Sequence, residues 1–230
     1  ANGGLALQDI SFNLQPGEFL GITGPTGSGK STLTQLIPRF YDVAAGRITV
    51  NGLDVQAWDL AALRHQIAFV PQTAVLFHGT IRENLQWGKA DATDEGCFQA
   101  LETAQCREFV EKLPEGLDTM VMENGKNFSG GQRQRLTIAR ALIRKPHLLI
   151  LDDSLSALDY QTDLDLRQAL ARDLDSAMII ISQRVRSIQQ AKEILVLDSG
   201  RLVGKGTHEA LLLSSSEYQA IVASQEEEHD

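Results

Sequence analysis

The chain has 230 residues, 43% of them hydrophobic, and a formal net charge of −9 at pH 7. This length can bury the core of one domain, while the acidic balance argues against nonspecific nucleic-acid binding, which needs a basic face. No run of about 18 apolar residues occurs, so the sequence predicts no membrane-spanning helix. Cys97 and Cys106 are too few and wrongly spaced for a disulfide framework or a metal knuckle, and we expect reduced, partly buried thiols.

Strand-like and helix-like patterns alternate along most of the chain. Short apolar runs predict strands at residues 19–23, 47–50, 67–70, 148–151, 178–182 and 194–197. Because helical patterns separate these runs, we expect an α/β fold with a largely parallel sheet and an antiparallel β edge near each terminus. Residues 5–14 alternate between apolar and polar, which predicts a half-exposed strand. From about 91 to 125, apolar residues recur at helical spacing, which predicts an inserted helical lobe.

A glycine-rich motif follows the first of these strands. It fits the phosphate-loop pattern G-x-x-x-x-G-K-[ST] and comprises Gly24, Pro25, Thr26, Gly27, Ser28, Gly29, Lys30, Ser31 and Thr32. Glycines let backbone N–H groups surround a phosphate, and the helix start adds partial positive charge. Lys30 is expected to reach the outer phosphates, and Ser31 to offer its hydroxyl to Mg²⁺. The sequence therefore predicts a site for a nucleoside triphosphate, which we take to be ATP, with Mg²⁺.

A buried apolar run that ends in a carboxylate supplies the expected second half of this site. Residues 148–151 lead directly to Asp152, the candidate ligand of Mg²⁺, either direct or through water. Alone, such a run is about as common in plain buried strands as in sites. Together with the phosphate loop, it indicates a P-loop nucleoside triphosphatase.

A second anion-binding helix start lies between these two motifs. Ser129 is an N-cap candidate, and Gly130, Gly131 and Gln132 open a helical pattern whose first N–H groups carry no bulky side chain. By itself this is equally an ordinary capped helix. At this point the chain resembles the ATP-binding cassette (ABC) family, whose signature S-G-G-Q these four residues match.

The resemblance covers nearly all of residues 1–230. It implies one nucleotide-binding domain with a RecA-like P-loop core, an antiparallel β subdomain, and a helical subdomain at 88–143 that carries the signature. In the family, two cassettes pair head to tail, so the signature of one completes the ATP site of the other. Three further positions match family motifs. Gln72 matches the Q-loop, whose glutamine contacts Mg²⁺ in the family. Asp159 matches the D-loop and Glu123 the exporter X-loop, and the resemblance places both at the interface. Residues 76–85 are similar to the exporter-type sequence after the Q-loop.

Two positions depart from the family pattern. The family has Glu after the metal-binding Asp, where it polarises the attacking water, but this chain has Asp153. A carboxylate one methylene shorter retreats by about 1 Å, which can cost roughly a hundredfold in rate. The family also has a switch His that contacts the γ-phosphate, and this chain has Gln183, which can donate a hydrogen bond but carries no positive charge. Together these changes resemble the degenerate site of a heterodimeric exporter, with Asp153, Gln183 and Gln72 as the candidate catalytic residues.

The surroundings of the domain are also predicted. In the family an adenine-stacking aromatic precedes the first strand, whereas residues 1–4 contain neither Met nor an aromatic residue. We expect a soluble fragment of a longer polypeptide whose transmembrane domain lies elsewhere, at the cytoplasmic face of a membrane such as the cell inner membrane. Arg133, Arg135, Arg140 and Arg144 cluster at helical spacing, which favours a solvated or interface face over a nucleic-acid patch.

The leading hypothesis is therefore the ATP-binding domain of an ABC exporter, an ATPase that hydrolyses weakly at its own site. Its partner would be a second half-transporter in a heterodimer, with this chain's signature completing the partner's site. One alternative is a soluble or importer-type cassette ATPase, against which the abrupt start and the exporter-like run 79–85 speak. The other is an ATP-dependent dimerisation module without hydrolysis, which Asp153 and Gln183 favour. The transported substrate is not encoded in this segment.

Overall fold

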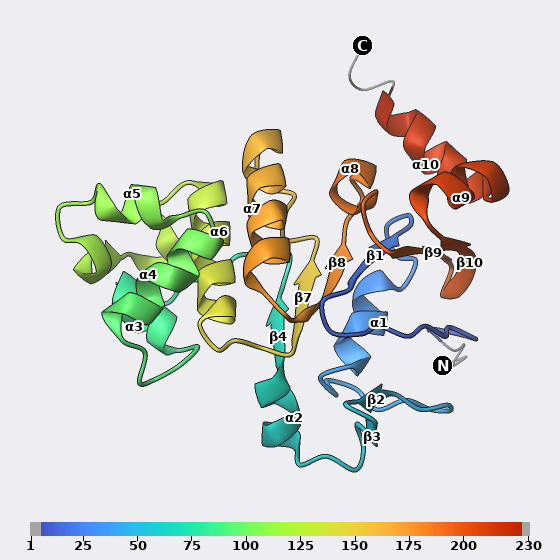
Figure 1. Ribbon diagram of the computed structural model, residues 1–230, viewed down its shortest axis with the longest axis horizontal. Helices are drawn as coiled ribbons and strands as arrows, with labels where there is room; N and C mark the ends of the chain where they lie inside the picture. The colour runs from blue at the N-terminus through green and yellow to red at the C-terminus, as the bar shows by residue number, and fades with distance from the viewer. Residues whose placement is uncertain (1–5, 227–230) are drawn as a thin grey trace. The chain divides into compact units, whose positions relative to one another are not determined.

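The structure is a computed structural model that describes residues 6–226. These residues form two compact units, one comprising residues 6–67 with 177–226 and the other residues 68–176. Figure 1 labels the helices and strands of both units. Among residues 6–226, no helix combines the length and the apolar character that a membrane crossing requires.

The first unit contains the neighbouring strands β10, β9, β1 and β8. Strand β1 (Phe19–Thr23) lies between β8 (Ala177–Ile181) and β9 (Glu193–Asp198) and is parallel to both (Figure 1). Strand β10 (Arg201–Gly206) pairs antiparallel with β9, as predicted for the C-terminal edge. The inner three strands are rich in buried Ile, Leu and Val, which is typical of strands covered on both faces. The α/β fold with a mostly parallel sheet is thus confirmed.

The N-terminal edge differs from the prediction. In its described part, residues 6–14, the alternating segment forms a single parallel bridge, between Gln8 and Arg201, and no regular strand. Its side chains alternate between exposed and half-buried from residue 9 to 14, so the pattern reflects one-sided burial without a hydrogen-bonded ladder. Asp9 interrupts the extended backbone with a φ of 53°. In the described part of residues 1–67, the antiparallel pairing is instead the hairpin of β2 (Thr49–Val50) and β3 (Leu53–Asp54).

The first unit contains helices between and after its strands, and α8, α9 and α10 pack on the sheet. They are α1 (Lys30–Leu36), α2 (Leu60–Gln66), α8 (Val185–Ile188), α9 (His208–Ser214) and α10 (Ser216–Glu226). Helix α8 packs on β1 at Gly21, where a Cβ would lie 2.8 Å from the Cβ of Ile188. Helix α10 in turn packs against α8, α9 and β10. The packing of α8 on β1, together with the parallel pairing of β8 with β1, places the segment between β8 and α8 at the carboxyl end of β1.

The second unit combines two neighbouring strands with a group of helices. Strand β7 (Leu148–Asp152) lies beside β4 (Ile67–Val70), and β5 (Gly79–Thr80) pairs antiparallel with β6 (Met120–Val121). The helices are α3 (Ile81–Gln86), α4 (Asp94–Thr103), α5 (Arg107–Glu111), α6 (Gly130–Leu142) and α7 (Tyr160–Asp173), with short 3-10 turns η1 (Gly116–Asp118) and η2 (Glu123–Gly125). The predicted helical lobe is present, although its boundaries at 88 and 143 stay a prediction.

The core of the helical part contains most of the apolar positions that recur at helical spacing. Cys97, Leu101, Ala104 and Val110 are fully buried, whereas Phe109 and Leu113 are half-buried. Both cysteines are free thiols, and burial raises the pKa of Cys97 and of Cys106 above the ordinary value. Strand β6 lies within the stretch predicted to be helical. The sequence did not predict this strand, because a run of two residues is too short to show a periodicity.

Candidate functional site

The phosphate loop of the first unit begins with a backbone that only glycine permits. Gly24 has a φ of 142°, and a Cβ there would lie 2.0 Å from the carbonyl oxygen of Leu197. Gly29, with a φ of 100°, precedes α1, and no side chain caps this helix. A helix start that lacks a side-chain cap favours an anion, because its N–H groups and its dipole both present positive charge. The loop geometry therefore fits a phosphate group.

Lys30 supplies the cation of this loop. Its side chain is largely buried, and Nζ donates hydrogen bonds to the carbonyl oxygens of Gly24 and Pro25, both over 2.7 Å. The same Nζ lies 3.4 Å from Oγ of Ser28. Carbonyl oxygens hold the ammonium group in the loop without cancelling its charge, so it can move onto phosphate oxygens. The donor set present here fits the polyphosphate of ATP.

The remaining loop positions differ in their exposure to solvent. Thr26, Gly27 and Ser31 are exposed, and Thr32 is half-buried in the first turn of α1. The exposed Ser31 hydroxyl is the group that would hold Mg²⁺ beside a bound triphosphate. A Cβ at Gly27 would meet nothing within 4 Å, which shows open space on that side of the loop.

Gln183 lies at the same loop, although it is far away in the sequence. Its Nε2 donates a hydrogen bond to Oγ1 of Thr26 over 3.5 Å, across 157 positions. Gln183 follows β8, and the next peptide is held by Oγ of Ser182, which accepts a hydrogen bond from the N–H of Arg184 over 3.0 Å. A neutral amide here can donate to an anion bound in the loop but cannot bring a positive charge. The structure thus places the predicted switch-position residue beside the phosphate loop.

A cavity of about 400 Å³ lies next to this loop within the first unit. Gly24 and Pro25 line one side, and Ala220, Ile221 and other residues of α10 line another. Gln225, also in its lining, bonds to the backbone of the Gln183 segment. No sequence motif pointed to this part of α10, whose contacts depend on tertiary packing.

The second unit brings Gln72 and Asp153 together. Asp152 is the last residue of β7 and is nearly buried. Asp153 follows it with a φ of 48°, a left-handed conformation that Asp adopts more readily than most residues. Its Oδ2 accepts a hydrogen bond from Nε2 of Gln72 over 3.0 Å. Carboxylate and amide oxygens are suitable Mg²⁺ ligands, so Asp152 and Gln72 fit the predicted metal role.

Ser129 caps helix α6, as the sequence predicted. Its Oγ accepts a hydrogen bond from the N–H of Gln132 over 3.2 Å, and Oε1 of Gln132 accepts one from the N–H of Ser129 over 2.9 Å. This reciprocal capping box uses both side chains to define the start of the helix. Gly130 is exposed and Gly131 half-exposed. Their small size leaves room at the helix start for an external group.

The D-loop segment lies against this helix start. A Cβ on Gly131 would be 3.5 Å from the carbonyl oxygen of Ala157 and from Cδ2 of Leu158. Asp159, the next residue, caps α7, since its carboxylate accepts hydrogen bonds from the N–H and the hydroxyl of Thr162. These bonds hold the pKa of Asp159 below its usual value. Glu123 is exposed in η2. The structure thus shows a capping contact for Asp159, and interface roles for Asp159 and Glu123 stay predictions.

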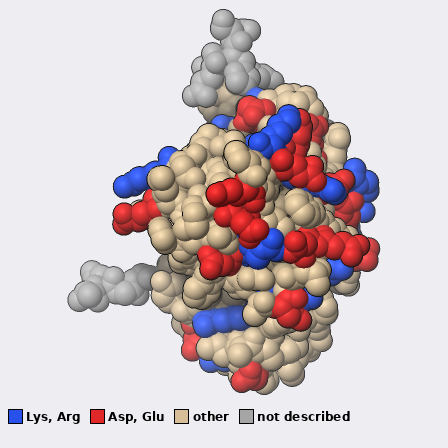
Figure 2. Space-filling view, turned by 90° about the vertical axis from the view of Figure 1, so that its left-hand side faces the viewer, with Lys and Arg blue, Asp and Glu red and all other residues tan. Residues whose placement is uncertain are grey.

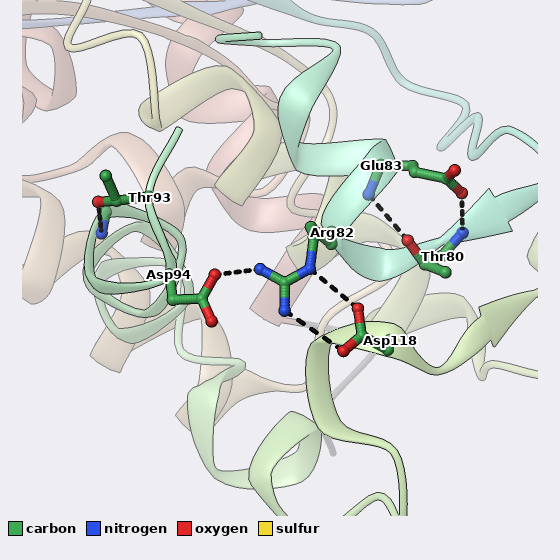
Figure 3. A network of polar contacts seen from close by, with 7 residues as sticks. Thr80, Arg82, Glu83, Thr93, Asp94 and Asp118 are labelled. Atoms are coloured by element: carbon green, nitrogen blue, oxygen red, sulfur yellow. Dashed lines mark hydrogen bonds and ion pairs between the residues drawn. The ribbon is translucent and has the colours of Figure 1, made fainter. Parts of the chain in front are cut away.

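The exporter-like segment 76–85 is held by a polar network. Oδ1 of Asn84 accepts a hydrogen bond from the N–H of Phe77, and its Nδ2 donates to the carbonyl of Phe77, both over 2.8 Å. Figure 3 shows that Arg82, on α3, reaches Asp118 and Asp94 from two other elements. The Arg82 guanidinium holds the pKa of Asp118 below its usual value. Thr80 and Glu83 complete a capping box at the start of α3 (Figure 3).

The clustered arginines of α6 make contacts inside the unit. The guanidinium of Arg133 donates to the carbonyl of Phe128, and that of Arg140 donates to the carbonyl of Val75. Burial lowers the pKa of Arg140. On the face shown in Figure 2, basic side chains lie interspersed with acidic ones. These contacts lie within the unit, and the preference for a solvated or interface face over a nucleic-acid patch stays a prediction.

Comparisons with known proteins agree with this geometry. The model of a family described as "ABC transporter" matches residues 7–156. An uncharacterized ABC transporter ATP-binding protein, YfiB, of Bacillus subtilis (strain 168) is 48% identical over 220 residues, which are 96% of this chain and 38% of that protein. The ABC multidrug transporter MDR2 of Trichophyton interdigitale (strain MR816) is 42% identical over 96% of this chain and 16% of its own length.

A solved structure is similar over nearly the whole chain. It is described as a bacterial Atm1-family ABC exporter with ATP bound, and it matches with a TM-score of 0.91 and 38% sequence identity. The match covers 96% of this chain and 39% of that one. The chain therefore spans well under two thirds of the length of each of these relatives.

Proposed function

The chain belongs to the ABC transporter family as an ATP-binding domain, and from this premise we propose that it serves an exporter as the subunit with the slower ATP site. Exporter-type relatives support the direction of transport. The proposal rests on one observation in each unit. In the second unit the short carboxylate of Asp153 accepts a hydrogen bond from Gln72, and in the first unit the neutral amide of Gln183 lies beside the phosphate loop.

The residues of the first unit would bind and orient the triphosphate. Lys30 would exchange its carbonyl contacts for β- and γ-phosphate oxygens, and the uncapped start of α1 would face the same oxygens. Gln183 would donate a hydrogen bond to the γ-phosphate. Mg²⁺, when bound, neutralises developing negative charge on the phosphates. Ser31, Asp152 and Gln72 are the side chains proposed to hold it.

The slow step of hydrolysis would be water activation. Asp153 would accept the proton of the attacking water. The hydrogen bond from Gln72 orients its carboxylate, but the shorter side chain keeps that carboxylate farther from the water than a Glu would. Gln183 supplies no positive charge to the transferred phosphoryl group. We infer that ATP is hydrolysed slowly at this site and stays bound through many turnovers of the partner's site.

The signature would act on the partner. Ser129 to Gln132 form a rigid, capped helix start whose glycines admit close approach of a phosphate. We propose that it completes the site of a second ABC half-transporter in a head-to-tail heterodimer, with Asp159 and Glu123 at the interface. The transmembrane domain would belong to the same transporter, which places the cassette at the cytoplasmic face of a membrane.

A second candidate function rests on the same two residues. If Asp153 and Gln183 abolish hydrolysis altogether, ATP would serve only to hold two cassettes together. The dimerisation module and the slow ATPase make opposite predictions for one measurement, namely whether this site turns over at all.

Single-turnover hydrolysis of Mg-ATP tests the proposal, in a heterodimer whose partner site is disabled by substitution of its phosphate-loop Lys. Asp153→Glu should accelerate hydrolysis modestly. The double variant Asp153→Glu with Gln183→His should raise the rate constant by more than the product of the two single-variant factors, because both residues would act on one phosphate. A parent rate equal to that of the double variant would contradict the slow-site proposal. A parent with no turnover, whose double variant is active, would favour the dimerisation module.

A further inference from the structure

Helix α10 bonds to the backbone of the segment that carries Gln183. Gln225, near the end of α10, is half-buried. Its Oε1 accepts a hydrogen bond from the N–H of Val185 over 2.9 Å, and its Nε2 donates one to the carbonyl oxygen of Gln183 over 2.6 Å. One side-chain amide thus pairs with the segment through both its donor and its acceptor, as the peptide group of a neighbouring strand would.

One of the groups that Gln225 binds, the N–H of Val185, lies at the start of a helix. Val185 is the first residue of α8, and the first N–H groups of a helix have no intrahelical acceptor. Arg184, at the N-cap position, makes no side-chain cap. Oγ of Ser182 accepts the hydrogen bond of the Arg184 N–H. Two side chains, from Ser182 and Gln225, therefore hold the backbone on the C-terminal side of Gln183.

The Gln183 side chain extends from this backbone toward the phosphate loop. Its Nε2 lies 3.5 Å from Oγ1 of Thr26 in the phosphate loop. Ile221 and other residues of α10 line the cavity of about 400 Å³ together with Gly24 and Pro25 of that loop. The Gln225 contact therefore connects α10 to the Gln183 segment at the rim of this cavity, where both residues also contribute to the lining.

We propose that Gln225 is a positioning residue for Gln183 and sets the preference of this site for ATP over ADP. It acts by fixing the peptide groups of Gln183 and Val185. The proposal rests on the proposed function, in which Gln183 donates a hydrogen bond to the γ-phosphate. ADP lacks that phosphate, so loss of the Gln225 contact weakens ATP binding selectively.

Calorimetric titration of the 230-residue chain with Mg-ATP and with Mg-ADP tests this proposal through the ratio of the two Kd values. Gln183→Ala should reduce the preference for ATP by roughly tenfold, the value of a hydrogen bond to a charged group. Gln225→Leu should reduce it by about threefold or more with ADP affinity unchanged, and the double variant should lose no more than Gln183→Ala alone.

Gln219→Leu is the matched control. Gln219 lies on the same helix, and its Nε2 donates to a backbone carbonyl over 2.7 Å, but that carbonyl belongs to Leu212 in α9. The control should keep the ratio of the parent. Gln225→Glu provides a second variant, because it keeps an acceptor for the N–H of Val185 and loses the donor to Gln183. It should preserve slow hydrogen exchange at the Val185 amide while the preference for ATP falls.

The outcomes separate the two proposals. An unchanged ratio in both Gln225 variants, alongside a reduced ratio in Gln183→Ala, would overturn the positioning role and leave the proposed function intact. Equal weakening of ATP and ADP would also overturn it, since that is the effect of a purely structural contact. A parent chain that binds no Mg-ATP would overturn both proposals.

Discussion

Gln72 donates a hydrogen bond from Nε2 to Oδ2 of Asp153 over 3.0 Å, although 81 positions separate the two residues in the chain. The carboxylate that would activate water is therefore oriented by a neutral amide. A short carboxylate depends on such a partner more than a long one, because its reach is limited by the position of its backbone. That backbone is itself unusual, with a φ of 48° at Asp153.

Gln72→Leu should slow single-turnover hydrolysis at this site about tenfold, because Asp153 loses the donor that orients it. The Kd of Mg-ATP should change by less than about threefold, since water can replace a neutral amide ligand of Mg²⁺. Rapid-quench kinetics in the heterodimer, with the partner site disabled, measure the rate. Weaker binding with an unchanged rate would assign Gln72 to holding the metal and not to orienting Asp153.

Lys30→Ala should weaken Mg-ATP binding by at least about a hundredfold, because it removes a charge-assisted contact to the phosphates and two bonds inside the loop. Isothermal titration calorimetry measures this loss. Lys192→Ala is the control, since Lys192 belongs to the same unit but pairs with Glu18 at the surface. The phosphate-loop assignment is wrong if the two variants bind ATP equally well.

Ser129→Arg should leave nucleotide binding by this chain nearly intact and suppress ATPase activity of the heterodimer, because bulk and charge would block approach of the partner's phosphate. The substitution also removes the N-cap of α6, at a cost of about 1 kcal/mol in the free energy of unfolding. Ser129→Ala loses the same cap without adding bulk, so it separates the two effects. Steady-state ATPase assays of both variants should show suppression by Arg well beyond that by Ala. Equal activity of the two would argue against a role of the signature at the interface.

Arg167→Met should lower the free energy of unfolding by about 3 kcal/mol, because it leaves the buried Asp163 carboxylate without its cation. The pair lies one turn apart on α7, with side-chain exposures of 8% and 2%. Arg172→Met, on the same helix, breaks an ion pair with Asp173 at the surface and should cost under about 1 kcal/mol. Urea unfolding followed by circular dichroism compares the two variants. Similar losses in both would mean that burial does not govern the contribution of these pairs.

Tyr218 should make the stability of the protein sensitive to alkaline pH. Burial, with a smaller effect of Glu209, raises the pKa of Tyr218 to about 12 from 10.0. The unfolded chain loses this proton near pH 10 and the folded chain near pH 12, so the free energy of unfolding should fall as pH rises through this window.

Tyr218→Phe should remove this part of the alkaline slope, which urea unfolding at pH 8 and pH 11 measures. It should also cost about 1 kcal/mol at pH 8, because Tyr218 Oη lies 2.8 Å from Nδ1 of His208. Tyr41→Phe, at an exposed position, is the control and should keep the slope of the parent. A slope that Tyr218→Phe does not alter would show that another group dominates the alkaline transition.

Features that depend on neighbouring residues were predictable from the sequence. The phosphate loop is a contiguous strand, loop and helix start, and the backbone required at Gly24 and Gly29 follows from residue type and order. The Ser129 cap is equally local, because an N-cap bonds to a residue three positions away. Apolar runs predicted the buried strands β1, β7 and β8, since burial on both faces leaves few polar positions.

Tertiary structure alone decided which distant groups meet. Burial alternates along residues 9–14 without a strand, because a ladder also needs a continuous partner edge, and only Gln8 finds one in the described part of that segment. No pattern within the sequence pairs Gln72 with Asp153 or Gln225 with the peptide groups of the Gln183 segment. Glutamine amides bond to whatever donor or acceptor packing brings within about 3 Å, and residue type does not specify that partner. The local sequence therefore specifies which chemical groups each motif contains. The packing of elements far apart in the chain determines how those groups are oriented.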